Sequence, residues 1–396
     1  MSPHIGIVSA RVAALSCAVI MLQPLTAVAI GDGSQPNSQI FQSVTGNLYG
    51  TAARGGTAGY GTIFEYTTGG SFSVLHNFGT GTDGEVPMGG LWYGPDGNLY
   101  GTTYWGGGSA NCGTVYKEAL SVGLGASYSI VHSFASTDGC HPTGRVSVTG
   151  TNSFPVVNGS TTMGAANSVG NLYMIDYTGA LTVLYNFKSH LPDSASPIGL
   201  ETAGPDFSAG MAEINSGSRC QSIYATMPNG MGGIIESEAY VFPPDDGPCP
   251  NQPVGAYPSQ ELITDGVGNF YGDARNYCPD LFRYSSSGVS IIYRGCAGPV
   301  SGWMFLTFGS DGYIYGTSET GGTNSLGTVF RMTTGGAVTV LHSFSQSEGY
   351  LPMAPLLPGM NGNFYGTTTK GGLSNNGTLF EMTPSGGLTV LHHFSG

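Results

Sequence analysis

Four residues have side chains suited to removing a proton next to a sugar carboxylate. His141, His190 and Tyr277 are of the types that act as general acids and bases, and Arg275 is of the type that clamps a carboxylate. A polysaccharide lyase needs such a set, because it removes a proton beside a uronate group. The simpler interpretation is that these residues are solvated loop residues. Catalysis by His141, His190 and Tyr277 is therefore a hypothesis, which Cys278 would support by tethering the loop beside Tyr277.

Hydrolysis of a glycosidic bond would need two opposed carboxylates, roughly 5 to 9.5 Å apart. Asp273 and Glu319 are candidates, but the sequence does not pair them. Phosphate loops, nucleophile elbows and zinc-protease motifs do not occur. Glycine is so abundant, at 66 of 396 residues, that its Gly-x-Gly patterns indicate nothing. No cofactor is predicted.

Other residues are suited to binding. Tyr104 and Trp105 are predicted to form an exposed aromatic platform for the face of a sugar, although Trp105 could equally cap a loop. Basic residues on the same molecular face would bind acidic groups of a ligand. The predicted basic ligand-binding residues are Arg54, Arg219, Arg275, Arg294 and Lys370.

The composition indicates a β-rich protein. Only 9% of the residues are charged, 11% are aromatic, and glycine and proline are frequent, which fits neither a helical nor a disordered chain. The net charge is −13 and no basic cluster is present. These features argue against nucleic acid or an anionic membrane as a partner.

Residues 1–29 are predicted to be a signal peptide. Arg11 is followed by an apolar run over 12–22 and by the small-x-small sequence of residues 27–29. No other stretch is long enough to span a bilayer. We therefore expect a secreted protein, extracellular or periplasmic, with no membrane span in the mature chain.

A unit of about 50 residues repeats along the chain. Each copy carries an aliphatic residue followed by an aromatic one, at Ile63-Phe64, Val115-Tyr116, Leu172-Tyr173, Ile223-Tyr224, Leu281-Phe282, Val329-Phe330 and Leu379-Phe380. This period is typical of propeller blades with four strands. We predict an all-β, seven-bladed β-propeller of four-stranded antiparallel blades over 30–396, with blades starting near residues 39, 87, 142, 197, 258, 301 and 352. The ring is expected to close by face packing of the first blade on the last, without a shared blade.

Several motifs carry a family resemblance. Tyr100-Gly101-Thr102-Thr103, Gly113-Thr114-Val115-Tyr116 and Val340-Leu341-His342-Ser343-Phe344 followed by Glu348-Gly349 resemble the GloVer (Gloeo-Verruco) tandem repeat of secreted bacterial proteins. The resemblance covers most of 39–396. It implies a secreted repeat protein, often with a terminal surface anchor, and supplies no catalytic residues. We expect no anchor here, because the sequence stops at Gly396, just past the last strand.

Six cysteines follow the predicted signal peptide, and an even number in an exported chain favours disulfides. Three of them precede the third strand of a unit and three follow the fourth strand. Those two places lie side by side in an antiparallel pair. The predicted disulfides are Cys112–Cys140, Cys220–Cys249 and Cys278–Cys296. No metal site is predicted, because Cys-x-x-Cys spacing is absent.

One face of the disc is expected to carry the function. The loops between strands two and three, and those from strand four to the next blade, share this loop face and hold a disproportionate share of the charges. Histidines recur in strand four at His76, His132, His342 and His392, which indicates a buried histidine hydrogen-bonded within the sheet. The acidic–glycine pairs Asp83-Gly84, Asp138-Gly139, Asp246-Gly247 and Glu348-Gly349 read as turns, with calcium binding as the alternative.

Two functions remain open. The first is a secreted binding or scaffold module for carbohydrate, such as a polysaccharide, or for another extracellular ligand. The second is an extracellular carbohydrate-active enzyme, a lyase before a hydrolase.

Overall fold

The computed structural model describes residues 31–79, 81–120, 127–187, 195–204, 207–214, 220–228, 234–241, 262–275, 279–295 and 298–396. The side chains of residues 127, 274, 275 and 279, and of the strands between 195 and 241, lie outside this description. The described residues belong to one compact unit, Gly31–Gly396, and the predicted signal peptide lies outside them. They form strands and no helix, so no described helix could cross a membrane.

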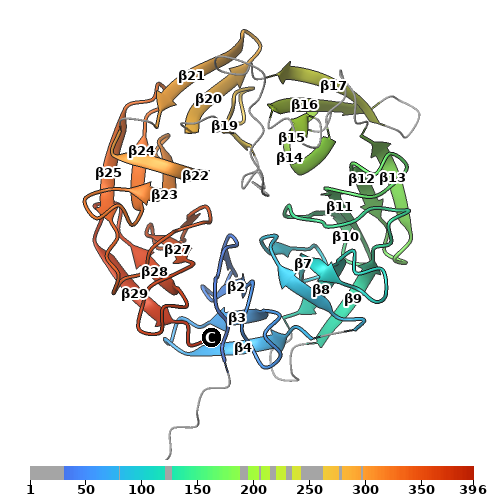
Figure 1. Cartoon of the computed structure of the whole chain (residues 1–396), viewed down its shortest axis with the longest axis horizontal. Coiled ribbons are helices and arrows are strands. Elements are labelled where there is room, and N and C mark those ends of the chain that lie inside the picture. The colour runs from blue at the N-terminus through green and yellow to red at the C-terminus, as the bar shows by residue number, and fades with distance from the viewer. Residues whose placement is uncertain are drawn as a thin grey trace, which may run out of the picture. The chain divides into compact units, whose positions relative to one another are not determined.

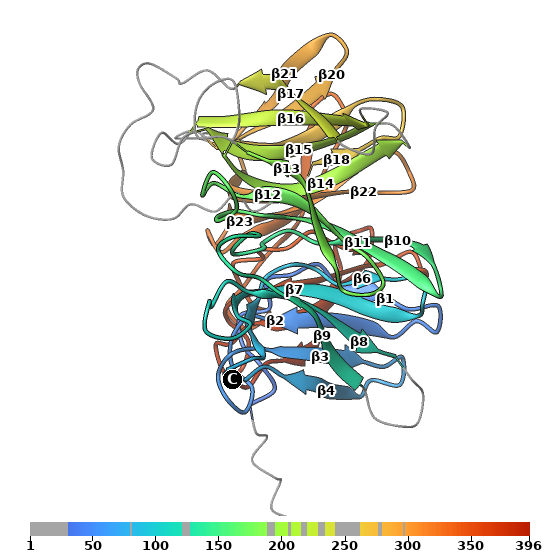
Figure 2. The ribbon, with the colours of Figure 1, turned by 90° about the vertical axis from the view of Figure 1, so that its right-hand side faces the viewer.

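Antiparallel sheets stand around a central axis, and the last strand of each lies at the periphery (Figures 1 and 2). The first sheet holds β1 (Phe41–Gln42), β2 (Leu48–Ala52), β3 (Thr62–Tyr66) and β4 (Phe72–Asn77). The next holds β5 (Gly84–Pro87), β6 (Trp92–Tyr93), β7 (Asn98–Gly106), β8 (Thr114–Ala119) and β9 (Ser127–Ser133). The third holds β10 (Ser147–Thr151), β11 (Phe154–Thr161), β12 (Asn171–Ile175) and β13 (Leu181–Asn186).

The remaining sheets follow the same order. They hold β14 (Ala195–Gly204), β15 (Phe207–Ile214), β16 (Cys220–Pro228) and β17 (Ile234–Val241); β18 (Ile263–Thr264), β19 (Phe270–Arg275), β20 (Pro279–Ser285) and β21 (Gly288–Arg294); β22 (Val300–Phe308), β23 (Ile314–Gly321), β24 (Thr328–Met332) and β25 (Val338–Ser343); and β26 (Leu357–Pro358), β27 (Phe364–Thr368), β28 (Thr378–Met382) and β29 (Leu388–His393). Each strand pairs with the next along the chain.

The prediction of seven four-stranded blades is wrong: within the described residues six sheets have four strands, and the sheet from Gly84 to Ser133 has five. The extra strand arises because β7 is nine residues long and pairs with two short strands, β5 and β6. Pro87 ends β5, and the segment 88–91 interrupts the pairing before Trp92. Proline removes a backbone donor, which explains the break in the inner strand.

Close packing inside each blade explains the Tyr-Gly pair of the second strand. At Gly366 a Cβ atom would lie 2.5 Å from the ring of Phe380, and at Gly101 it would lie 2.3 Å from the hydroxyl of Tyr116. The aromatic residue of strand three therefore lies directly over the glycine of strand two. Only glycine leaves room for it, which links two motifs that stand about 15 residues apart.

The ring closes as the sequence predicts, without a shared sheet. Strands β1–β4 form the first sheet and β26–β29 the last. Ile40, Leu48 and Phe64 of the first sheet pack in one core cluster with Leu379 and Phe394 of the last. A polar contact that the sequence analysis missed reinforces this seam: Asp32 Oδ2 lies 2.7 Å from His392 Nε2.

Candidate functional site

A five-residue loop recurs on the loop face, between strand four of one blade and strand one of the next. In the described part of the chain it begins with an acidic residue and glycine and ends with proline, at 32–36, 83–87, 138–142 and 348–352; the sequence has a further copy at 246–250, outside the described residues. The first copy precedes the first blade in the sequence and contacts the last blade in space. Position by position, these four copies allow structural features to be separated from features that occur once.

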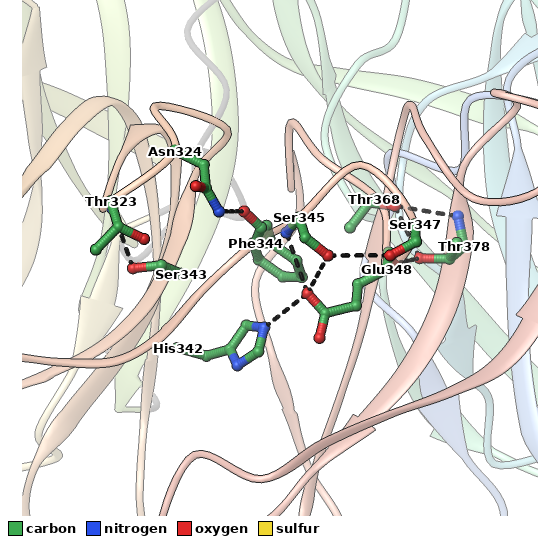
Figure 3. Close-up of polar contacts among 10 residues, drawn as sticks. All are labelled: Thr323, Asn324, His342, Ser343, Phe344, Ser345, Ser347, Glu348, Thr368 and Thr378. Atoms are coloured by element: carbon green, nitrogen blue, oxygen red, sulfur yellow. Dashed lines mark hydrogen bonds and ion pairs between the residues drawn. The ribbon is translucent and has the colours of Figure 1, made fainter.

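The acidic residue of each loop binds the recurring histidine of strand four. Nε2 lies 3.2 Å from the carboxylate in His76–Asp83, 3.1 Å in His132–Asp138 and 3.3 Å in His342–Glu348. In the last of these, Glu348 also accepts hydrogen bonds from the amide and hydroxyl of Ser345 (Figure 3). We call this arrangement the histidine–acid clamp. It joins the end of one blade to the start of the next.

The clamp corrects one expectation, which concerns the histidines. The histidines are partly buried, and they bond to the following loop rather than within their sheet. The acidic residues are histidine and amide partners, and among the described residues no cluster of three or more His, Cys, Asp or Glu could hold a metal ion. Burial alone would raise the pKa of Asp83, but hydrogen bonds from His76 and from the amides of Gly79 and Gly84 lower it overall.

The fourth residue of each loop has a left-handed backbone. Its φ is 56° at Gln35, 58° at Val86, 58° at His141 and 54° at Leu351. Such values strain a residue other than glycine, yet four unrelated side chains accept them at this position. The strained backbone of His141 is therefore part of the repeated scaffold. Its imidazole is not, because no other copy carries one there.

The third residue of each loop bridges to the end of the second strand. The bridged pairs are Ser34 with Arg54, Glu85 with Trp105, Cys140 with Met163, and Tyr350 with Lys370. The backbone contact is constant while the side chains change completely. Lys370, Arg54, Trp105 and Met163 thus occupy one equivalent position on four successive blades, which we call the variable arc.

Trp105 is the exposed aromatic residue of this arc, with 38% of its surface accessible. Its ring stands edge-on to His141 at 4.2 Å and to Tyr104 at 4.9 Å. His141 stacks on Tyr104 at 4.5 Å and donates a hydrogen bond from Nδ1 to the Tyr104 carbonyl oxygen at 2.9 Å. Tyr104 is only 4% exposed, so it supports Trp105 from below instead of forming a shared platform.

A disulfide fixes this aromatic cluster. Cys112 and Cys140 are joined as predicted, and Cys140 directly precedes His141. The His141 amide also donates to the Cys112 carbonyl oxygen at 2.8 Å. In the loop-entropy model a closed loop of this length contributes about 3 kcal/mol to stability. The other two predicted disulfides involve cysteine side chains outside the described residues.

The predicted basic residues divide into three groups. Arg54 and Lys370 lie on the variable arc, and their side chains make no hydrogen bond or ion pair within the described ranges. Arg294 instead faces the buried Asp280, with 3.8 Å between Nη1 and Oδ2. The side chains of Arg219 and Arg275 lie outside the description.

The described residues do not bring the lyase set together. His190 and Tyr277 lie outside them, as does the side chain of Arg275, and His141 is held against Tyr104 and Trp105. The glycosidase candidates belong to adjacent sheets: Asp273 is buried on β19, and Glu319 on β23 accepts a hydrogen bond from the Trp303 amide. Catalysis stays a prediction.

Sequence reasoning missed Met163 as a member of the variable arc and Glu85 as the cross-strand partner of Trp105. A signal for both was present, because aligning the four acid–glycine loops places Glu85 beside Trp105 and Cys140 beside Met163. Without knowledge of the bridge, these side chains look like isolated loop residues.

The repeated clamp, loop and bridge agree with a family comparison. The chain matches the model of the Gloeobacter/Verrucomicrobia repeat over residues 17–224 and 251–396. It belongs to this family. No curated protein matches the chain by sequence.

Solved structures share the fold of this Gloeobacter/Verrucomicrobia repeat protein. A puromycin hydrolase has a TM-score of 0.58 and 10% identity, with 93% of this chain and 55% of that chain covered. A Mycobacterium tuberculosis puromycin-hydrolyzing peptidase has a TM-score of 0.55 and 11% identity, with 92% of this chain and 54% of that chain covered. A putative 6-phosphogluconolactonase from Bacteroides fragilis has a TM-score of 0.53 and 17% identity, with 88% of this chain and 95% of that chain covered. The chain spans about half the length of the two peptidases, and identities this low show the fold alone.

Proposed function

We propose that this protein is a binding module that takes a carbohydrate on its loop face, with Trp105 as the principal contact. The supporting observation is the presentation of Trp105: an exposed indole, braced by His141 and Tyr104, on a backbone position that the other blades use for unrelated side chains. Tryptophan stacks on the apolar face of a sugar ring, and a braced ring loses little entropy on binding.

Glu85 supplies the polar contact that such a site requires. It is the cross-strand partner of Trp105 in the β5–β7 pair and is partly exposed. Directly opposed residues project from the same side of a sheet, with their Cβ atoms about 5 Å apart. Its carboxylate is therefore suited to accepting hydrogen bonds from the hydroxyl groups of a sugar stacked on Trp105.

The proposal is tested by titration calorimetry of the purified protein against a panel of neutral and acidic oligosaccharides. Trp105→Ala should weaken binding at least tenfold, which corresponds to about 1.4 kcal/mol. Met163→Ala is the matched control, because Met163 occupies the equivalent position on the next blade and is 46% exposed. If no oligosaccharide binds, or if the Trp105 variant binds as tightly as the parent, this function is wrong.

A further inference from the structure

Charged side chains are distributed unevenly along the variable arc. Lys370 stands on the last blade, Arg54 on the first and Trp105 with Glu85 on the second, in that order around the ring. The first and last blades are neighbours, since the Gln35 amide donates to the Asn376 carbonyl oxygen across their seam. Two cations therefore lie on one side of the indole, and a carboxylate lies beside it.

These two cations differ from other cations of the described chain. Arg145 lies 4.3 Å from the centre of the Trp92 ring and donates to Gln39, and Arg331 lies 5.1 Å from the centre of the Tyr313 ring. Within the described ranges, the side chains of Arg54 and Lys370 have no such partner, and that of Arg54 is exposed. In a protein with a net charge of −13, these two cations are available to an acidic ligand, because neither forms an ion pair in the described part of the chain.

We propose that the ligand is an acidic oligosaccharide, which stacks one sugar ring on Trp105 and directs carboxylate groups toward Arg54 and Lys370. This inference rests on the proposed carbohydrate-binding function and names the class of ligand. Arginine binds carboxylates in a bidentate way, and lysine acts as a point charge. Glu85 repels an acidic group at the opposite end, so the charged part of the ligand extends over the first and last blades.

The test compares a uronate oligosaccharide with its methyl-esterified form, which keeps the sugar rings and loses the charges. A sulfated oligosaccharide of similar length shows whether any anion suffices. The parent protein should bind the free uronate at least tenfold more tightly than the ester, and this preference should decrease as sodium chloride rises from 50 to 500 mM. If the sulfated ligand binds and the uronate does not, the carboxylate assignment is overturned.

Three variants separate the contributions. Arg54→Gln with Lys370→Gln should remove the preference for the free uronate and leave binding of the ester unchanged. Trp105→Ala should weaken binding of both ligands. Lys117→Gln, which removes a charge from strand β8, should change neither. Folding of each variant is checked by its melting temperature. The proposal requires the side chains of Arg54 and Lys370 to be free for a ligand, so a double variant that fails to fold would show that they hold the structure instead and would contradict the proposal.

The outcomes distinguish the two levels of the argument. Equal binding of the ester and the free uronate, with no effect of the double substitution, overturns the acidic ligand and leaves carbohydrate binding in place. If neither ligand binds, the acidic uronate ligand is overturned, and carbohydrate binding is overturned as well when the sulfated and neutral oligosaccharides also fail to bind.

Discussion

Glu118 is the residue that departs most from its repeat. The equivalent residues of two other blades are Met332 and Met382, which are buried against apolar neighbours. Glu118 is just as buried, and neither carboxylate oxygen has a hydrogen-bond partner in the described part of the chain. Burial raises its pKa from 4.5 to about 7. A position that holds methionine in two other blades therefore holds an acid here that is half ionised near neutral pH.

Replacing Glu118 with Met should stabilise the protein, mainly above pH 7. The folded state holds the proton more tightly than the unfolded chain, so Glu118 becomes increasingly destabilising as the pH rises from 4.5 to 7. The difference reaches about 3 kcal/mol, because one pKa unit corresponds to about 1.4 kcal/mol. Urea unfolding at several pH values measures it.

A Glu118→Gln variant serves as the control, since it remains polar and cannot titrate. Its stability should lack the pH-dependent loss between pH 4.5 and 7 and remain below that of the Met variant. If the difference in unfolding free energy between the parent and the Glu118→Met variant stays constant from pH 4.5 to 7, the raised pKa of Glu118 is contradicted.

At the scale of the element, the second strand shows what one sequence predicts and what it does not. The Asn-x-Tyr-Gly motif is visible without a structure. Its polar partner is not, because it comes from two places. In the first and last blades Tyr49 and Tyr365 donate to Glu65 and Glu381 of strand three. In two others, a carboxylate in the preceding turn accepts instead: Asp96 from Tyr100 and Asp311 from Tyr315.

The same reasoning explains the histidines. Their recurrence in strand four was visible, and it correctly indicated a structural role. For three of them the partner lies six or seven residues later, beyond the end of the strand, and for His392 it is Asp32 near the start of the chain, so a search within the sheet could not find it. For the candidate site, the sequence identified Trp105 and the disulfide. The sequence could not show which of the two adjacent aromatic residues, Tyr104 or Trp105, points inward. Either ring could have filled the buried face of the strand.

Substituting Glu348 with Gln tests the clamp. Burial favours the neutral acid, but hydrogen bonds from Ser345 and the nearby His342 lower the pKa of Glu348 below 4.5 overall. The ionised form therefore stabilises the fold above pH 4.5, and this contribution is lost as the pH falls through the folded-state pKa. At pH 7 the variant should lose about 1 kcal/mol. Denaturant titrations at pH 7 and pH 3 should show the deficit at the first pH and little at the second; equal deficits would contradict the clamp.

The whole molecule depends on one seam where the chain is not continuous. Between other neighbouring blades a loop connects strand four to strand one. At the seam, Asp32 takes that place: Oδ2 contacts His392, and Oδ1 accepts from the amide and hydroxyl of Ser395 at 2.6 and 2.9 Å. The apolar faces alone would leave the ring held by packing. The Asp32–His392 clamp adds a directional contact at this seam, in the place where the polypeptide chain itself connects the other pairs of neighbouring blades.

Asp32→Ala should therefore loosen both terminal blades together. Amide hydrogen exchange in β1–β4 and β26–β29 is expected to accelerate, because these sheets separate when the seam opens. Asp83→Ala breaks the corresponding clamp where the chain is continuous, so it should accelerate exchange only locally around 76–87. Equal effects of the two variants would show that Asp32 has no special role in closing the ring.

The central claim is that a constant scaffold presents changing side chains at the ends of its second strands, and that a carbohydrate binds there. A crystal structure of the protein with a uronate tetrasaccharide tests it most directly. The account predicts a sugar ring stacked on Trp105, with carboxylates near Arg54 and Lys370. A ligand bound on the opposite face, near Val44 and Tyr93, would contradict it.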